Sequence, residues 1–218
     1  TLSRAGGAVE LKPGDNVVVK GGLYRKPLRI TVSGERNKPI TIKAAANERV
    51  LVKGSKVIRG EWKRISGRNE EEPYPNAFKS IWSIKLDDSY FKCVHKGKEM
   101  RFPYVKTVFL NDKPLRMIGP DPMYPNKKYL QLNVFGKGVS DMWRDTFFFD
   151  GKTKTLYICI SGEPTWYTLE MGTIPKILGV SKCHDVVVEG MDFAQNRQIG
   201  GQWSMAGIGD SERVTVRK

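Results

Sequence analysis

The chain is poor in the residues that build metal centres and disulfide frameworks. Its 218 residues include only two histidines and three cysteines. The three cysteines, Cys93, Cys159 and Cys183, are far apart and odd in number, so at most one disulfide can form and a disulfide scaffold is excluded. With only His95 and His184 and no Cys-x-x-Cys pair, a histidine-rich metal site is excluded as well. We interpret both histidines as structural.

Long apolar segments are also missing. No run reaches the roughly 18 apolar residues that a membrane-spanning helix needs, so we expect no membrane span. The polar start at residues 1–4 is not that of a signal peptide, although a leader removed during processing would leave the same start. Zinc-finger spacing, an aromatic RNA-binding signature and a basic helix with heptads are absent, which disfavours nucleic acid as a partner.

Positive charge is abundant. The chain carries 37 Lys and Arg against 23 Asp and Glu, a net charge of +14 that no single tail supplies. A basic surface attracts polyanions such as nucleic acid, anionic lipid or acidic polysaccharide. The alternative is that many of these lysines are solvated strand and turn positions. The 22 glycines and 12 prolines favour a turn-rich fold over a helical bundle.

A short pattern recurs along the chain: polar turn residues, then alternating valines, then in three of the four copies a glycine. The copies lie at residues 15–21, 48–54, 184–190 and 212–217. Each copy predicts a short β-strand bounded by turns. The first two are 33 positions apart (17 to 50) and the last two are 28 apart (186 to 214).

Two further strands are expected between the first pair of copies, at residues 28–32 and 39–43, joined by a polar turn at 33–38. Several short strands per repeat with no helix between them favour a solenoid over a βαβ fold. In such a coil each strand pairs with its counterpart one rung along, and the inward side chains form a continuous core that favours Val and Ile. The alternative is a β-sandwich with coincidental valine triplets; the repeated small residue favours the solenoid.

Residues 60–174 differ in character and separate the copies around Val50 and Val186. The stretch holds four of the five tryptophans: Trp62, Trp82, Trp143 and Trp166. Hairpins are predicted for 146–149 with 155–160 around Asp150-Gly151, and more weakly for 108–110 with 114–115. We therefore expect an antiparallel β subdomain over 60–174. It would be inserted between an N-terminal cap with the first rungs (1–59) and the resumed coil (175–218).

The ends of the chain resemble a known family. Residues 1–5, 11–17, 21–24 and 33–44 are similar to the opening of right-handed parallel β-helix proteins, the pectate-lyase-like superfamily. Members with an inserted β subdomain resume the helix at a Val-x-Val-x-Gly-Met-x-Phe segment, here Val186 to Phe193. The resemblance implies an all-β right-handed parallel β-helix (solenoid) interrupted by an antiparallel β subdomain. It also implies a capping helix at residues 1–11.

The resemblance implies a carbohydrate-active protein that is secreted, periplasmic or at the cell surface. Lyases of this fold abstract the proton next to a uronate carboxylate with Lys, Arg or His, while Ca²⁺ or basic side chains neutralise the carboxylate. Hydrolases of the fold use paired Asp and Glu. We expect a polysaccharide lyase or glycoside hydrolase, with the charge favouring an acidic glycan. The alternative is a non-catalytic binding or adhesion module. No cofactor is evident from the residues; Ca²⁺ comes from the resemblance alone.

Candidate site residues follow the strand at 186–188. Asp192 and Arg197 are the candidate catalytic residues. The candidate substrate-binding residues are Gln195, Asn196, Gln198 and Trp203, the last as a sugar-stacking platform. The alternative is that Asn196 only bonds between turns and Asp192 only faces solvent. In the insertion, the residues that could border a cleft are Asp121, Asp141, Trp143, Arg144 and Asp145.

The strand at 214–218 has no capping element behind it. Natural proteins cover such edges, because an exposed strand edge is prone to aggregation. We therefore expect the resumed coil to be truncated at Lys218 and the polypeptide to continue past it, while the sequence leaves open whether the catalytic residues lie within these residues or beyond them.

Overall fold

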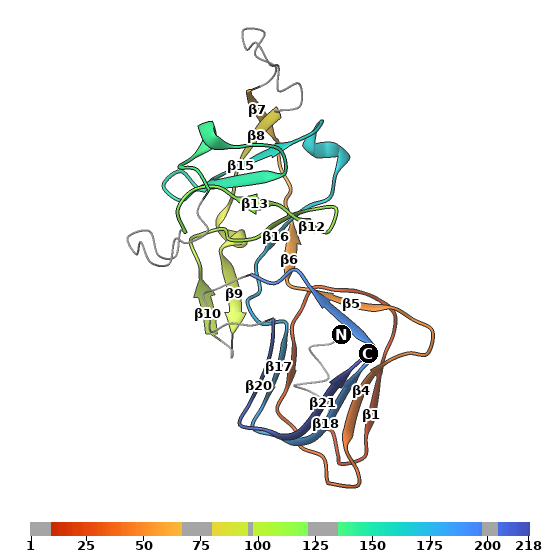
Figure 1. The fold of residues 1–218 in the computed structure, drawn as a ribbon. Helices are drawn as coiled ribbons and strands as arrows, with labels where there is room; N and C mark the ends of the chain where they lie inside the picture. Colours follow the sequence, from red (N-terminus) through yellow and green to blue (C-terminus); the bar gives the residue numbers. More distant parts are fainter. Residues whose placement is uncertain (1–9, 67–79, 96–97, 122–134, 198–204) are drawn as a thin grey trace. The chain divides into compact units, whose positions relative to one another are not determined.

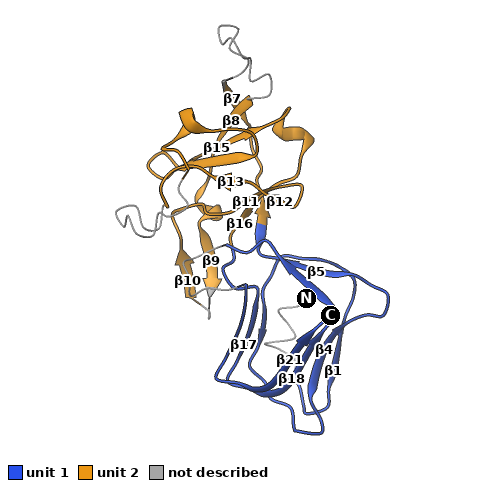
Figure 2. Ribbon diagram, in the orientation of Figure 1, with its two compact units in different colours: residues 1–55, 174–218 blue, residues 56–173 orange. Residues whose placement is uncertain are grey.

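The structure is a computed structural model, and it describes residues 10–66, 80–95, 98–121, 135–197 and 205–218. These residues form β-strands and short 3-10 turns, in an all-β fold with both parallel and antiparallel sheets (Figure 1). The chain divides into two compact units: Thr1–Ser55 with Ile174–Lys218, called unit 1, and Lys56–Thr173, called unit 2 (Figure 2). Within the described ranges no helix has the length and apolar character to cross a membrane.

Unit 1 is built from three parallel sheets. The first has the order β1-β4-β18-β21, formed by Asn16–Val19, Ile40–Ala44, His184–Glu189 and Glu212–Arg217. The second has the order β19-β5-β2, formed by Met191–Ala194, Val50–Lys53 and Gly22–Tyr24. The third has the order β20-β17-β3, formed by Ala206–Gly209, Leu178–Ser181 and Leu28–Ile30. Strands that follow one another in the chain thus fall in different sheets.

One apolar core is shared by these three sheets. Ile40 and Ile42 of β4 are fully buried, and Val188 of β18 lies in register with Ile42. Leu178 from the third sheet and Val52 from the second join the same buried cluster. β-Branched side chains suit this arrangement because alternate residues of each strand point inward and stack on the equivalent residue of the next strand.

The predicted repeat is partly wrong in its pairing. The copies around Val17 and Val50 are not counterparts, because β1 pairs with β4 and β5 pairs with β2 and β19. Inward positions in every sheet call for the same residue types, so a valine pattern alone does not identify the sheet. The later copies do pair, with Val186 opposite Val214 and Val188 opposite Val216.

Unit 2 is dominated by a five-stranded sheet of order β13-β14-β15-β8-β7. Its strands are Arg116–Met117, Thr146–Asp150, Thr155–Ile160, Ser80–Lys85 and Lys63–Ser66. A four-stranded sheet of order β12-β11-β16-β6 is formed by Lys113–Pro114, Val108–Leu110, Leu169–Gly172 and Ser55–Val57. A third, two-stranded sheet pairs β9 (Lys92–His95) with β10 (Lys98–Arg101). Three 3-10 turns are described: η1 (Asp88–Tyr90), η3 (Val139–Asp141) and η4 (Pro164–Trp166).

Both predicted hairpins are confirmed. β14 and β15 pair from Thr146 opposite Cys159 to Asp150 opposite Thr155, so the connection is four residues rather than a two-residue Asp-Gly turn. The Asp150 carboxylate accepts hydrogen bonds from the Thr153 hydroxyl at 2.8 Å and the Lys152 amide at 2.9 Å, which lowers the pKa of Asp150. The second hairpin, β11 with β12, turns at two residues of positive φ, Asn111 and Asp112, which tolerate that conformation.

Candidate functional site

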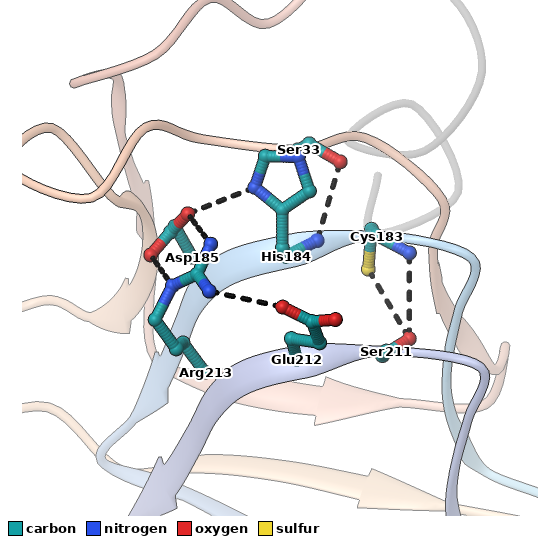
Figure 3. A network of polar contacts seen from close by, with 7 residues as sticks. All are labelled: Ser33, Cys183, His184, Asp185, Ser211, Glu212 and Arg213. Carbon is teal, nitrogen blue, oxygen red and sulfur yellow. Dashed lines mark hydrogen bonds and ion pairs between the residues drawn. The ribbon is translucent and has the colours of Figure 1, made fainter.

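A buried carboxylate at the start of β18 in unit 1 binds two basic side chains. The Asp185 side chain is 5% exposed. Its carboxylate accepts two hydrogen bonds from the Arg213 guanidinium, from Nε at 2.7 Å and Nη2 at 2.8 Å. The imidazole of His184 lies with Nδ1 2.8 Å from Oδ2 of the same carboxylate. Figure 3 shows the two basic groups converging on Asp185.

The register of the parallel sheet brings Asp185 and Arg213 together. Asp185 lies between His184 and Val186 on β18, and Arg213 lies between their partners Glu212 and Val214 on β21. Both residues have left-handed backbone conformations, with φ of 55° and 47°. In a regular strand, successive side chains point to opposite faces, and this backbone conformation interrupts that alternation in β18. Asp185 and Val186 are therefore both buried although they are adjacent in the chain.

Neighbouring turns hold the backbone of the site in place. The His184 amide donates to Ser33 Oγ at 3.2 Å, and the Gly34 amide donates to the His184 carbonyl at 2.9 Å. On the other side, the Ser211 hydroxyl accepts from the Cys183 amide at 3.4 Å (Figure 3). The site is therefore supported from the turns on both sides of it.

The electrostatics of the group follow from this pairing. The bidentate hydrogen bonds from Arg213 hold the pKa of Asp185 well below its ordinary value of 3.8, and the same contact raises the pKa of Arg213. Asp185 is thus ionised at neutral pH and is not suited to donate a proton. His184, whose side chain is 49% exposed, is oriented through Nδ1, which leaves Nε2 as the nitrogen available for proton transfer.

We predict that this carboxylate makes the protein less stable in acid. A carboxyl with a lowered folded pKa contributes stability above its unfolded pKa, and that contribution is lost as pH falls through the folded value. The melting temperature should therefore fall on acidification below about pH 5, and Asp185→Asn should flatten that part of the profile while lowering stability at neutral pH. Thermal melts across this pH range would measure both effects.

Asp210→Asn is the control for that experiment, since it removes one exposed carboxylate from the same unit. An Asp185→Asn protein whose melting temperature is lowered by the same amount at every pH would contradict the prediction.

Asp192, predicted as a catalytic residue, lies on β19 in an ion-paired group. Its carboxylate accepts a hydrogen bond from Arg49 Nε at 3.0 Å, and Lys218 Nζ lies 3.7 Å away. The hydrogen bond from Arg49 lowers the pKa of Asp192, with a smaller contribution from Lys218. Asp192 is therefore also ionised at neutral pH, like Asp185.

Of the predicted residues 195–197, Gln195 and Arg197 are buried and Asn196 is half-buried. Gln195 is 7% exposed, and its Oε1 accepts from the Ser55 hydroxyl at 2.6 Å. Asn196 donates from Nδ2 to the Pro175 carbonyl at 3.0 Å. Arg197 is 1% exposed, and its amide donates to the carbonyl of Ile174 at 2.9 Å. Asn196 and the Arg197 backbone thus bind residues 174–175, where the chain re-enters unit 1, while Asp192 binds Arg49.

Two other predictions fall on parts of the chain that the structure does not cover. Gln198 and Trp203 lie outside the described residues, as do residues 1–9 of the expected capping helix.

The candidate cleft residues of unit 2 make separate local contacts and do not form one shared cluster. Asp121 pairs with Lys106 at 2.7 Å, with the two side chains 18% and 9% exposed. Asp141 accepts from the Lys137 amide at 2.6 Å, and Asp145 lies 3.8 Å from Arg144 Nε. Among these residues, Trp143 alone lies in an aromatic contact, described below.

Ca²⁺, which the resemblance implies, binds to oxygen ligands gathered at one place. Nowhere in the described ranges do three or more His, Cys, Asp or Glu side chains gather as metal ligands would. No step of the proposed chemistry is therefore assigned to Ca²⁺.

Sequence reasoning interpreted His184 as structural and did not single out Asp185 or Arg213. One signal was present: Asp185 and Arg213 have the same spacing of 28 as Val186 and Val214, which pair across β18 and β21. Once the valines are placed in register, the acid and the base between them must be neighbours.

Comparison with models of protein families gave no match, and neither did comparison with curated proteins. Two solved structures are similar to this chain. One is described as "The complex structure of XylC with xylose", with a TM-score of 0.49 and 15% identity over 93% of this chain and 35% of that one. The other is described as "Glycoside hydrolase", with a TM-score of 0.47 and 10% identity over 84% of this chain and 43% of that one. This chain thus spans less than half the length of either.

Proposed function

We propose that unit 1 is a right-handed parallel β-helix and that the chain belongs to a secreted, periplasmic or cell-surface protein that acts on a polysaccharide. The fold part of the proposal is supported by three parallel sheets that take successive strands of the chain in turn and share one core. Repeated coils of this kind create long outer surfaces on which equivalent positions line up.

The observation that carries the functional proposal is one row of charged residues on the outside of unit 1. Lys43, Glu189 and Arg217 occupy equivalent positions on β4, β18 and β21, and Arg217 Nη2 lies 2.7 Å from the Glu189 carboxylate. Adjacent strands are about 4.8 Å apart, so the charged groups of such a row recur at regular intervals along a line. An extended polymer matches this geometry better than a compact small molecule. The net charge of +14 favours an acidic glycan.

Elimination suits the two candidate aspartates of unit 1, Asp185 and Asp192, better than hydrolysis. A hydrolase needs a carboxylic acid with a raised pKa as its proton donor, whereas the pKa values of Asp185 and Asp192 are both lowered. In a lyase reaction a base takes the proton from the carbon next to the uronate carboxylate. The electron pair of that bond forms a carbon–carbon double bond, and the glycosidic oxygen leaves and takes up a proton. The half-exposed His184 is the side chain best arranged to accept the first proton.

A non-catalytic polysaccharide-binding or adhesion module is the second candidate. It is favoured by the internal pairing of the charged groups, since Asp185 and Asp192 both bind basic side chains of this chain. Rows of charge bind a polymer without any convergent catalytic groups. A glycoside hydrolase would require acidic residues other than these two.

The first test is an assay of ultraviolet absorbance from unsaturated uronate products over pectate, alginate and glycosaminoglycans, with Ca²⁺ and with chelator. We expect a rising signal on at least one acidic glycan. His184→Gln should reduce the rate about 100-fold or more, as loss of a general base does. Binding of pectate should be measured beside it, with fully methyl-esterified pectin as the uncharged match.

Each outcome has a distinct meaning. Binding of pectate with no absorbance change on any glycan would support the non-catalytic module instead of the lyase. Failure to bind any acidic glycan would overturn the proposal as a whole.

A further inference from the structure

Two exposed aromatic rings lie side by side in unit 2 with an arginine over one of them. Phe135 and Trp143 are 40% and 37% exposed. Their ring centroids are 5.9 Å apart at an interplanar angle of 84°. Arg116 Cζ lies 4.7 Å from the centroid of Phe135. We call Phe135, Trp143 and Arg116 the aromatic platform.

The backbone of the platform is held by the five-stranded sheet. The Trp143 amide donates to the hydroxyl of Thr146, which is fully buried at the start of β14. The Arg116 amide donates to the Asp145 carbonyl at 2.9 Å, and the Gly119 amide donates to the Phe135 carbonyl at 2.9 Å. Three segments of the chain, around Arg116, Phe135 and Trp143, are thereby fixed beside one another, so little ordering is needed when a ligand binds.

The composition of the platform is that of a binding surface. A single exposed aromatic residue needs no explanation, because much of any protein surface is apolar. Two adjacent exposed rings with an arginine are different, since Trp, Phe and Arg are the residues enriched at the energetic centres of interfaces. The two rings meet edge to face and offer apolar area at an angle to one another, and the exposed Arg116 offers a fork of donors that matches a carboxylate.

We propose that the aromatic platform is a second glycan-binding site, which takes a uronate-containing polysaccharide by stacking a sugar ring on one of the two aromatic rings, with the other ring at its edge, and pairing the sugar carboxylate with Arg116. This inference rests on the proposed function and adds to it a site built from residues of unit 2. The C–H face of a pyranose ring is apolar and fits an aromatic ring, while its carboxylate is complementary to arginine and to the positive net charge.

The test is the affinity of the full chain for polygalacturonate, measured by calorimetry, in the parent and in Trp143→Ala, Phe135→Ala and Arg116→Gln. We expect the two aromatic substitutions to weaken binding about tenfold each. Arg116→Gln should reduce the preference for polygalacturonate over its methyl ester. Trp166→Ala is the matched control, since Trp166 is a 68% exposed tryptophan of the same unit outside the platform.

Thermal melts separate loss of binding from loss of folding, and only variants that melt within a few degrees of the parent are compared. If the parent binds and the platform variants bind equally well, the platform is not a glycan site although the proposed function stands. Equal losses of affinity in Trp166→Ala and Trp143→Ala would also overturn the site.

Tighter binding of single-stranded nucleic acid than of polygalacturonate through the same residues would overturn the choice of ligand, since bases stack on aromatic rings too. A parent chain that binds no acidic glycan refutes the proposed function itself.

Discussion

Gly34→Ala is expected to destabilise unit 1 by about 3 kcal/mol, the upper part of the range for forcing an added group into a packed site. A Cβ at this position would lie 2.5 Å from the Asp185 carbonyl oxygen and 2.8 Å from the Ile40 amide nitrogen. Both atoms belong to backbone, so neither can move aside as the end of a flexible side chain would. Chemical denaturation of the full chain would measure the loss.

The same substitution should disturb the candidate site. The Gly34 amide donates to the His184 carbonyl. If the added methyl group pushes the turn at Gly34 away from the start of β18, His184 and Asp185 are both displaced. If His184 is the base, the lyase rate should fall in Gly34→Ala under conditions where the protein is still folded.

Gly209→Ala is the matched control for Gly34→Ala. It adds the same methyl group to another glycine of unit 1, on β20, where an added Cβ meets no atom within 4 Å. Its effect should be close to zero or slightly stabilising, because alanine restricts the unfolded chain more than glycine does. Equal stability losses in the two variants would show that the close approach of backbone atoms at Gly34 is not the cause of the destabilisation.

Phe147→Ala is expected to destabilise unit 2 by about 3–5 kcal/mol, as is usual for removing a large aromatic side chain from a packed core. Phe147 is fully buried on β14 and pairs across the sheet with Ile158, which is also fully buried. The substitution leaves a cavity that the two flanking strands can fill only in part. The measurement is again the free energy of unfolding from denaturant titration.

The effect of Phe147→Ala should extend to the aromatic platform. Thr146, the preceding residue, holds the Trp143 backbone, so loosening of β14 should also weaken binding of polygalacturonate. Ile65→Ala, at a 47% exposed position on β7 of the same unit, should change stability by no more than about 0.5 kcal/mol. A Phe147→Ala protein as stable as Ile65→Ala would mean that the core of unit 2 is not packed as described.

Local structure was the part of the fold that could be predicted from sequence. The Val186–Val188 and Val214–Val216 segments are strands, and they pair as their spacing indicated. The turn at Asn111 and Asp112 was predictable because these residue types tolerate positive φ. Each of these features depends on the preferences of a few neighbouring residues, which a sequence displays directly.

The candidate site was less predictable, because its members come from different turns of the chain. Asp192 was singled out from its place after a strand, but its partner Arg49 lies 143 positions away. Gln195 and Arg197 are polar residues in a turn-like stretch, yet both side chains are buried. Nothing in the local sequence distinguishes a polar residue that faces solvent from one that is bonded inside.

The sequence by itself determined that this is a β-rich chain with short valine-rich strands at both ends, an aromatic stretch between them and a net charge of +14. These properties follow from residue types and their spacing. Only the tertiary structure decided that the copies around Val17 and Val50 lie in different sheets, and that Asp185 meets Arg213. The reason is physical: inward positions of all three sheets require the same β-branched residues, so the valine pattern marks strands without saying which of them pair.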